Sequence, residues 1–145
     1  MKKLLLFALI VLVPALIMGQ AKFASDSAEA RGLSERVVKT FFQKNPRAGL
    51  TELQDYVHSD VSEGLSKVKF MTIASTFEKF EHWYANPQTY FLASTEKLGT
   101  MGLKYVYIVQ YGRRVIKLSF IYLKASEGWY LGDFNKSENY QTEFK

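Results

Sequence analysis

The feature that most constrains this chain is a two-residue reversal, Gly112-Arg113, between two long segments of alternating polarity, 103–111 and 115–124. Two-residue loops with glycine in the first position are typical of β-hairpins. Such a loop also fixes the register of the two strands. Pairing Tyr111 with Arg114 places only apolar and aromatic residues on one face, namely Leu103, Tyr105, Tyr107, Val109, Ile116, Leu118, Phe120 and Tyr122. The sequence therefore predicts a hairpin with one buried face.

The opposite face of this hairpin is mixed. It interleaves polar residues with four apolar ones, Val106, Ile108, Val115 and Ile121. Apolar side chains grouped on an open face are one means by which proteins bind each other. Docking or homodimerisation through this sheet face is therefore one prediction for the chain.

Helical periodicity precedes the strands. The spacing of Asp26 and Glu29 is typical of a capping box, and apolar residues then recur on one face as far as Phe42. Asn45-Pro46 ends this helix, because the residue before a proline avoids helical backbone angles. A short second stripe spans 50–57, where the segment beginning at Thr51 repeats the capping pattern.

A third helix runs from about residue 67 until Asn86-Pro87 stops it. The period then changes to two, and strands are predicted over 90–97 and 129–135 in addition to the hairpin. The fold class is therefore α+β, with N-terminal helices packed on a curved antiparallel sheet of about four strands. A polar tail begins at about residue 137.

The N-terminal segment has the pattern of a secretory signal peptide. Lys2 and Lys3 precede an uninterrupted apolar run, and small residues follow at 19 and 21. The run, 4–18, is shorter than the roughly 20 residues that a membrane-spanning helix needs. We expect cleavage after Ala21, a single domain over 22–145 with no transmembrane span after cleavage, and export to the periplasm or medium. The alternative is an uncleaved N-terminal anchor, because the boundary with Lys22 is not sharply polar.

Composition excludes several classes of protein. The chain is 48% hydrophobic and 15% aromatic, so it can bury a core and is not a disordered tail. It has no cysteine, which excludes disulfides, cysteine zinc sites and a thiol nucleophile. Loss of Lys2 and Lys3 lowers the formal charge from +5 to +3, and the remaining positive residues are scattered. A nucleic-acid interface needs clustered cations, so no nucleic-acid partner is predicted.

Chemical motifs are sparse. No metalloprotease, phosphate-binding, nucleophile-elbow or dinucleotide pattern occurs. Glu78 and His82 lie four residues apart on the third predicted helix and could share a metal, but a third ligand is not evident. We therefore predict no metal, no cofactor and no assigned catalytic residue.

Asp133 is the one carboxylate that the pattern singles out. If the loop 125–128 has four residues, Lys124 pairs with Trp129, and Asp133 joins the aromatic face beside Phe120. A carboxylate buried there would have a raised pKa and could hold a polar ligand group or act as a base. If the loop is one residue shorter or longer, Phe134 takes the inner face and Asp133 turns outward. The sequence leaves both alternatives open.

Two stretches carry a family resemblance. They are Arg36-Val37-Val38-Lys39-Thr40-Phe41-Phe42 with the following segment 50–61, and Glu127-Gly128-Trp129-Tyr130-Leu131-Gly132-Asp133-Phe134 after the last hairpin. Their order and texture resemble the nuclear transport factor 2-like superfamily, the cystatin-like α+β roll, over roughly 26–136. The resemblance implies helices packed on a curved sheet around a conical pocket. Some members are ketosteroid isomerases or polyketide cyclases, but their catalytic residues match no position of this chain.

Three functions follow from these features. The first is a small exported binding or accessory protein, with an apolar or amphipathic ligand held between helices and sheet by Tyr105, Tyr107, Phe120, Tyr122 and Asp133. The second is the interaction module that docks or dimerises through the mixed sheet face. The third is a pocket enzyme of isomerase or dehydratase type that uses Asp133. The lack of a catalytic motif favours binding over catalysis.

Overall fold

The structure is a computed structural model that describes residues 21–43, 45–58, 61, 65, 67–84 and 87–138, with the backbone alone for 80–84. The predicted signal peptide, up to residue 20, and the end of the predicted tail lie outside these residues. Three helices precede four strands, as predicted: α1 (Ser27–Phe42), α2 (Pro46–Gln54), α3 (Lys67–Tyr84), β1 (Pro87–Leu98), β2 (Gly102–Tyr111), β3 (Arg114–Lys124) and β4 (Trp129–Ser137). The strands form an antiparallel meander in the order β1-β2-β3-β4.

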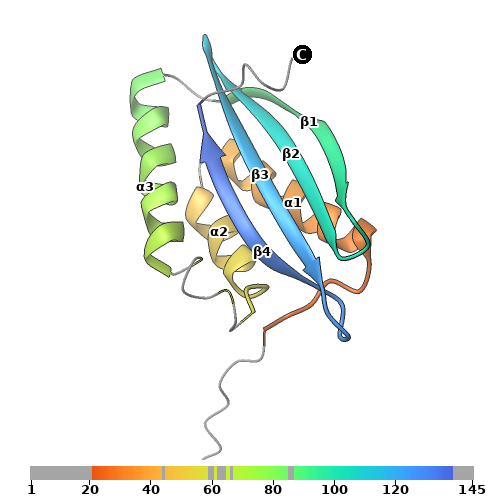
Figure 1. Cartoon of the computed structure of the whole chain (residues 1–145). Coiled ribbons are helices and arrows are strands. Elements are labelled where there is room, and N and C mark those ends of the chain that lie inside the picture. The colour runs from red at the N-terminus through yellow and green to blue at the C-terminus, as the bar shows by residue number, and fades with distance from the viewer. Residues whose placement is uncertain are drawn as a thin grey trace, which may run out of the picture.

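The helices cover one face of the twisted sheet. Figure 1 shows α1 and α2 behind the strands and α3 alongside β4. Aromatic rings join these layers: Phe41 of α1 stacks on Phe77 of α3 at 4.4 Å, and Phe70 of α3 stacks on Phe134 of β4 at 6.1 Å. The predicted α+β class, with helices packed on one face of a four-stranded antiparallel sheet, is therefore confirmed.

The hairpin between β2 and β3 has the predicted register throughout. Tyr111 pairs with Arg114, and the pairing continues without a shift to Leu103 and Tyr122. Gly112 has a φ of 58°, which lies in the left-handed region that glycine adopts most easily. All the residues predicted for the inner face are buried. The two-residue reversal therefore determined both the pairing and the side that faces the helices.

Capping explains where the first two helices begin. Asp26 accepts a hydrogen bond from the Glu29 amide at 2.8 Å, and the Glu29 carboxylate accepts one from the Ser25 amide at 2.7 Å. The second helix begins earlier than predicted, because Asn45 caps it and Pro46 occupies its first turn. The pair that ends α1 thus also starts α2, and Thr51 lies inside the helix rather than at its cap.

The two edges of the sheet differ. The β4 edge is partly covered by the N-terminal strap, residues 22–24, in which Ala24 exchanges two 2.8 Å backbone hydrogen bonds with Trp129. Next to it, the Leu131 amide donates to the Tyr56 carbonyl at 2.8 Å. On β1, no described residue pairs with the outer edge. Its pairing with β2 contains an irregularity between Leu92 and Ser94.

Candidate functional site

The predicted inner wall is a packed aromatic layer. Tyr105 and Tyr107 of β2 are 3% and 2% exposed, and Phe120 and Tyr122 of β3 are fully buried. The rings pack edge to face, with centroids 6.0 Å apart for Tyr105 and Tyr122 and 5.9 Å apart for Tyr107 and Phe120. These four residues lie together as predicted, but they form core between the helices and the sheet. They line neither the hollow on the outer face of the sheet nor the hollow along α3, both of which are described below.

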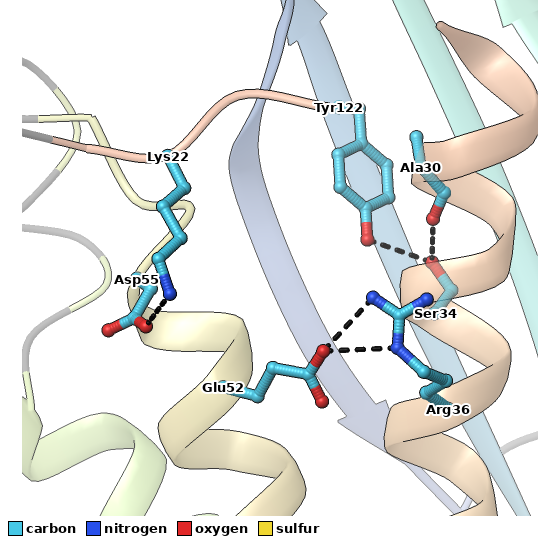
Figure 2. A network of polar contacts seen from close by, with 7 residues as sticks. All are labelled: Lys22, Ala30, Ser34, Arg36, Glu52, Asp55 and Tyr122. Carbon is cyan, nitrogen blue, oxygen red and sulfur yellow. Dashed lines mark hydrogen bonds and ion pairs between the residues drawn. The ribbon is translucent and has the colours of Figure 1, made fainter. Parts of the chain in front are cut away.

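Two of the three tyrosine hydroxyls in this layer bind α1. Tyr122 lies 2.9 Å from the Ser34 hydroxyl, which itself donates to the Ala30 carbonyl at 3.0 Å, so Tyr122 is the donor to Ser34 (Figure 2). The Tyr105 hydroxyl donates to the Ser27 carbonyl at 2.7 Å. Burial raises the pKa of the Tyr122 phenol well above its ordinary value, and the Ser34 hydroxyl only partly offsets this.

The third hydroxyl, that of Tyr107, is buried and forms no hydrogen bond with any residue the structure describes. The pKa of Tyr107 is raised to about 12, mainly by burial and also by the Glu35 carboxylate, while Arg31 opposes the rise. The Arg31 guanidinium thus opposes the rise both by its charge and by a polar contact with the phenol that falls short of full hydrogen-bonding geometry. A buried hydroxyl without a partner costs roughly 1–3 kcal/mol, which marks this position as one that a ligand atom or water could complete.

Asp133 lies on the opposite face. Lys124 pairs with Trp129, so the four-residue loop is confirmed, but the register shifts before Asp133, which pairs with Ile121. Gly132 is the extra residue of this β-bulge. The expectation that a four-residue loop brings Asp133 to the aromatic face is therefore wrong, because the bulge inverts the side-chain alternation beyond it. Phe134 takes the inner position and packs on Phe120.

The Asp133 carboxylate is held in place from two sides. It accepts a 3.1 Å bond from the Lys69 ammonium of α3 and a 2.8 Å bond from the Phe134 amide. Glycine at 132 gives room for the bulge, because a Cβ atom there would lie 2.7 Å from the Leu123 Cγ. The carboxylate is therefore ion-paired and partly exposed, and it is not buried in the aromatic layer as the expected base would be.

A hollow of about 420 Å³ lies on this outer face of the sheet, across β2, β3 and β4. Its volume falls within the range of small-molecule pockets. The residues that line it are polar, with Ile121 as the apolar member: Lys104, Lys117, Ser119, Ile121, Asp133, Asn135, Lys136 and Ser137. Three lysines and a single carboxylate give the lining itself a formal charge of +2, and two of these lysines also pair with acids outside it, Lys104 with Glu96 and Lys136 with Glu138. The hollow is therefore suited to an acidic group with hydroxyl and amide donors beside it.

The outer face is less apolar at its surface than the sequence predicts. Val106 is fully buried and Ile108 is 2% exposed, although the register places both on this face. Their cross-strand neighbours flank them, with Ser119 beside Val106 and Lys117 beside Ile108. A partner that approaches this face would therefore meet mainly polar groups around the hollow, together with the 47% exposed ring of Phe91 on β1, which pairs with Ile108.

A second hollow, of about 530 Å³, runs along α3. All the described residues that line it belong to that helix, among them Val68, which is 73% exposed. Because no other described element closes this hollow, it presents an open apolar strip rather than an enclosed site.

Metal-site geometry is not seen in the described part of the chain. No group of three or more metal-ligating side chains occurs there. Glu78, one of the two residues considered for a metal, instead binds Arg47 through both oxygens, at 2.6 and 2.9 Å. The side chain of His82 lies outside the described residues. Among the described helices, none is long and apolar enough to cross a membrane.

Sequence reasoning missed two contributors to these sites. Ser34 occupies a position within the apolar face of α1, one turn after Ala30, and a hydroxyl in an apolar stripe is a signal that a buried partner exists. Lys69 could not be found in this way, because its contact with Asp133 depends on how α3 lies against β4.

Comparison with known proteins gives no match. No family model fits this chain, and no curated protein or solved structure is similar to it.

Proposed function

We propose that this chain is a small exported binding protein that holds the acidic head group of an amphipathic ligand in the outer hollow. The observation that carries the proposal is the volume of about 420 Å³ combined with a lining of charge +2. The nuclear transport factor 2-like resemblance is kept as a proposal for the fold family, since three helices packed on a four-stranded antiparallel sheet agree with it, but it does not locate the outer hollow. Catalysis by Asp133 is not part of the proposal, because this carboxylate is ion-paired with Lys69.

The hollow provides two kinds of contact. Lysine ammonium groups form charge-assisted hydrogen bonds with a carboxylate or phosphate, and these are about twice as strong as neutral ones. Lys104 contributes from β2 and Lys117 from β3, while the hydroxyl of Ser119 lies between them on the same face. Ile121 gives an apolar contact for the first methylene groups of a chain.

The test uses dodecanoate, with dodecanol as the uncharged analogue, and follows binding through backbone amide shifts. The proposal expects dodecanoate to shift resonances of β3 and β4 around Ser119 and Asn135, and dodecanol to bind at least tenfold more weakly. Lys117→Gln should weaken dodecanoate binding about tenfold, the equivalent of one charge-assisted hydrogen bond. Arg113→Gln is the matched control, because Arg113 lies exposed at the hairpin turn outside the hollow. Equal binding by both variants would contradict the proposal.

A second candidate places the ligand between α1 and the sheet, at the Tyr107 hydroxyl. The observation in its favour is that this buried hydroxyl has no hydrogen-bond partner among the described residues. An oxygen acceptor on the ligand would accept from Tyr107 with Arg31 nearby. If the ligand binds at this second position, the same titration should shift resonances around Tyr107 and Arg31. Tyr107→Phe should then lose binding, while Lys117→Gln should bind as tightly as the wild type.

Homodimerisation through the sheet face stays a prediction of the sequence. The residues buried under the outer face, Val106 and Ile108, leave it less apolar area than predicted. Sedimentation of the chain starting at Lys22 tests it, since a face-to-face dimer would double the sedimenting mass and protect the outer face from ligand.

A further inference from the structure

The N-terminal strap begins directly after the predicted cleavage site and is held by the C-terminal end of α2. The Lys22 amide donates to the Asp55 carbonyl at 2.7 Å, and the Lys22 ammonium lies 2.7 Å from the Asp55 carboxylate. Figure 2 shows this side chain reaching from the strap to α2. Phe23 packs against His58 and Tyr130, with ring centroids 6.1 and 6.3 Å apart. The first residues after the predicted cleavage site are thus held by both main-chain and side-chain contacts.

The C-terminal end of α2, where the strap docks, carries negative charge that a nearby cation would stabilise. The last carbonyls of a helix carry a partial negative charge equivalent to about half an elementary charge. Asp55, the C-cap residue, adds a full negative charge at the same point, and the last turn of α2 contains no basic residue. At Asp55 the positive charge comes from Lys22, which is distant in sequence, while Arg36 of α1 pairs with Glu52 in the last turn of α2.

We propose that the amine released by cleavage between Ala21 and Lys22 binds the Asp55 carbonyl, so that signal removal places a second cation at this helix end. Hydrolysis adds one water across the peptide bond, leaving a carboxylate on Ala21 and an amine on Lys22 that takes a proton near neutral pH. The nitrogen already lies at hydrogen-bonding distance from the carbonyl, so the new charge needs no movement of the strap. This inference rests on the export included in the proposed function, but not on any ligand.

Docking of the strap also orders the two events. A peptidase binds its substrate as an extended segment on both sides of the bond it cleaves. Lys22 and Ala24, directly after that bond, are paired with Asp55 and Trp129 in the folded domain. Cleavage therefore requires the strap to be undocked, and docking afterwards holds the processed end rather than letting it fray as most termini do.

The experiment compares three forms of the chain by thermal unfolding at low ionic strength: one starting at Lys22, the same chain acetylated on the α-amine, and one starting at Ala21. Acetylation keeps the N–H donor but removes the charge, and the extra residue moves the charge away. The free Lys22 form should melt about 2–4 °C higher than either of the others, as expected for a cation at a helix end. The difference should shrink in molar salt, because the charges are exposed.

Two results would overturn the inference. One is equal melting temperatures for the free and acetylated forms. The other is an exported protein whose N-terminus, read by mass spectrometry, is not Lys22. Neither result depends on dodecanoate binding, so a failure here is distinguishable from a failure of the proposed function. Asp55→Asn gives the control for the carboxylate, and it should reduce the effect of acetylation while the helix carbonyls retain part of it.

Discussion

The two faces of the sheet are formed by alternating residues of the same strands, but polar atoms have opposite environments on them. On the inner face, tyrosine rings are buried and two of the hydroxyls bind α1. On the outer face, Val106 and Ile108 are buried, and charged side chains surround a hollow at the surface. Aromatic residues that alternate along a strand can therefore serve as core, as they do on the inner face, while the hollow across β2, β3 and β4 opens on the outer face.

The largest expected difference between the faces is in packing. Phe120→Ala should lower the free energy of unfolding by about 3–5 kcal/mol, because it removes a fully buried ring and leaves a cavity. Ser119→Ala, the next residue on the outer face, should change it by no more than about 0.5 kcal/mol. Urea unfolding measures both. Similar losses at the two positions would show that the outer face is packed as tightly as the inner one.

The next effect concerns the bulge that assigns Asp133 to the outer face. Gly132→Ala should destabilise the fold by about 1–3 kcal/mol, because the new Cβ would lie 2.7 Å from Leu123 Cγ. Gly32→Ala is the matched control, since its Cβ would meet only Arg36 at 3.7 Å within α1, where alanine favours the helix. Urea midpoints that fall equally for both variants would contradict this role of the bulge.

Alkaline pH should weaken the inner face. Burial raises the pKa of Tyr107 to about 12, above the ordinary phenol value near 10, so the folded state favours the neutral form. The stabilisation is complete below pH 10 and is lost as the pH rises from about 10 through 12, by on the order of 1–2 kcal/mol. Tyr107→Phe should show a shallower loss over this range. A parallel loss in both proteins would mean that other groups cause it.

Two hydroxyls of the inner face should respond differently to removal. Tyr122→Phe should cost about 1 kcal/mol, because it deletes the hydrogen bond with Ser34. Tyr107→Phe at neutral pH should be neutral or slightly stabilising, since it removes a buried hydroxyl that has no partner among the described residues. Thermal unfolding of the two variants measures this difference in stability. A larger loss of stability in Tyr107→Phe than in Tyr122→Phe would contradict the prediction.

The smallest effect is expected on the outer face at the ion pair. Asp133→Asn should change the free energy of unfolding by less than about 1 kcal/mol, because both Lys69 and Asp133 are partly exposed. Raising the salt concentration should reduce even this difference. A loss of several kcal/mol in urea unfolding would indicate that the pair contributes far more than its exposure allows.

The extent to which the sequence predicted this structure depended on how local the signal was. The register of β2 and β3 followed from Gly112 and Arg113, because a two-residue loop leaves one pairing that buries an apolar face. The sequence did not determine on which face of the sheet Asp133 lies, because the bulge at Gly132 depends on Leu123 of the neighbouring strand. The start of α2 was missed because Asn45-Pro46 ends one helix and begins the next.

The candidate site was less predictable than the fold. The four aromatic residues of the inner wall were placed together correctly, but alternation cannot distinguish a pocket wall from a packed core. The outer hollow combines residues from three strands, and its shape depends on the twist of the sheet and on the bulge. Such a surface leaves no periodic pattern in the sequence.

The uneven sheet edges have a consequence for self-association. With β4 bonded to the strap and to the segment after α2, a strand from another molecule would add along β1 in the part of the chain described. The irregularity between Leu92 and Ser94 breaks the straight row of amides that such a template requires, and Glu96 and Lys97 add charge beyond it. Fibril growth on this protein would therefore have to start on the uncharged stretch 89–92, a length too short to hold a new strand firmly.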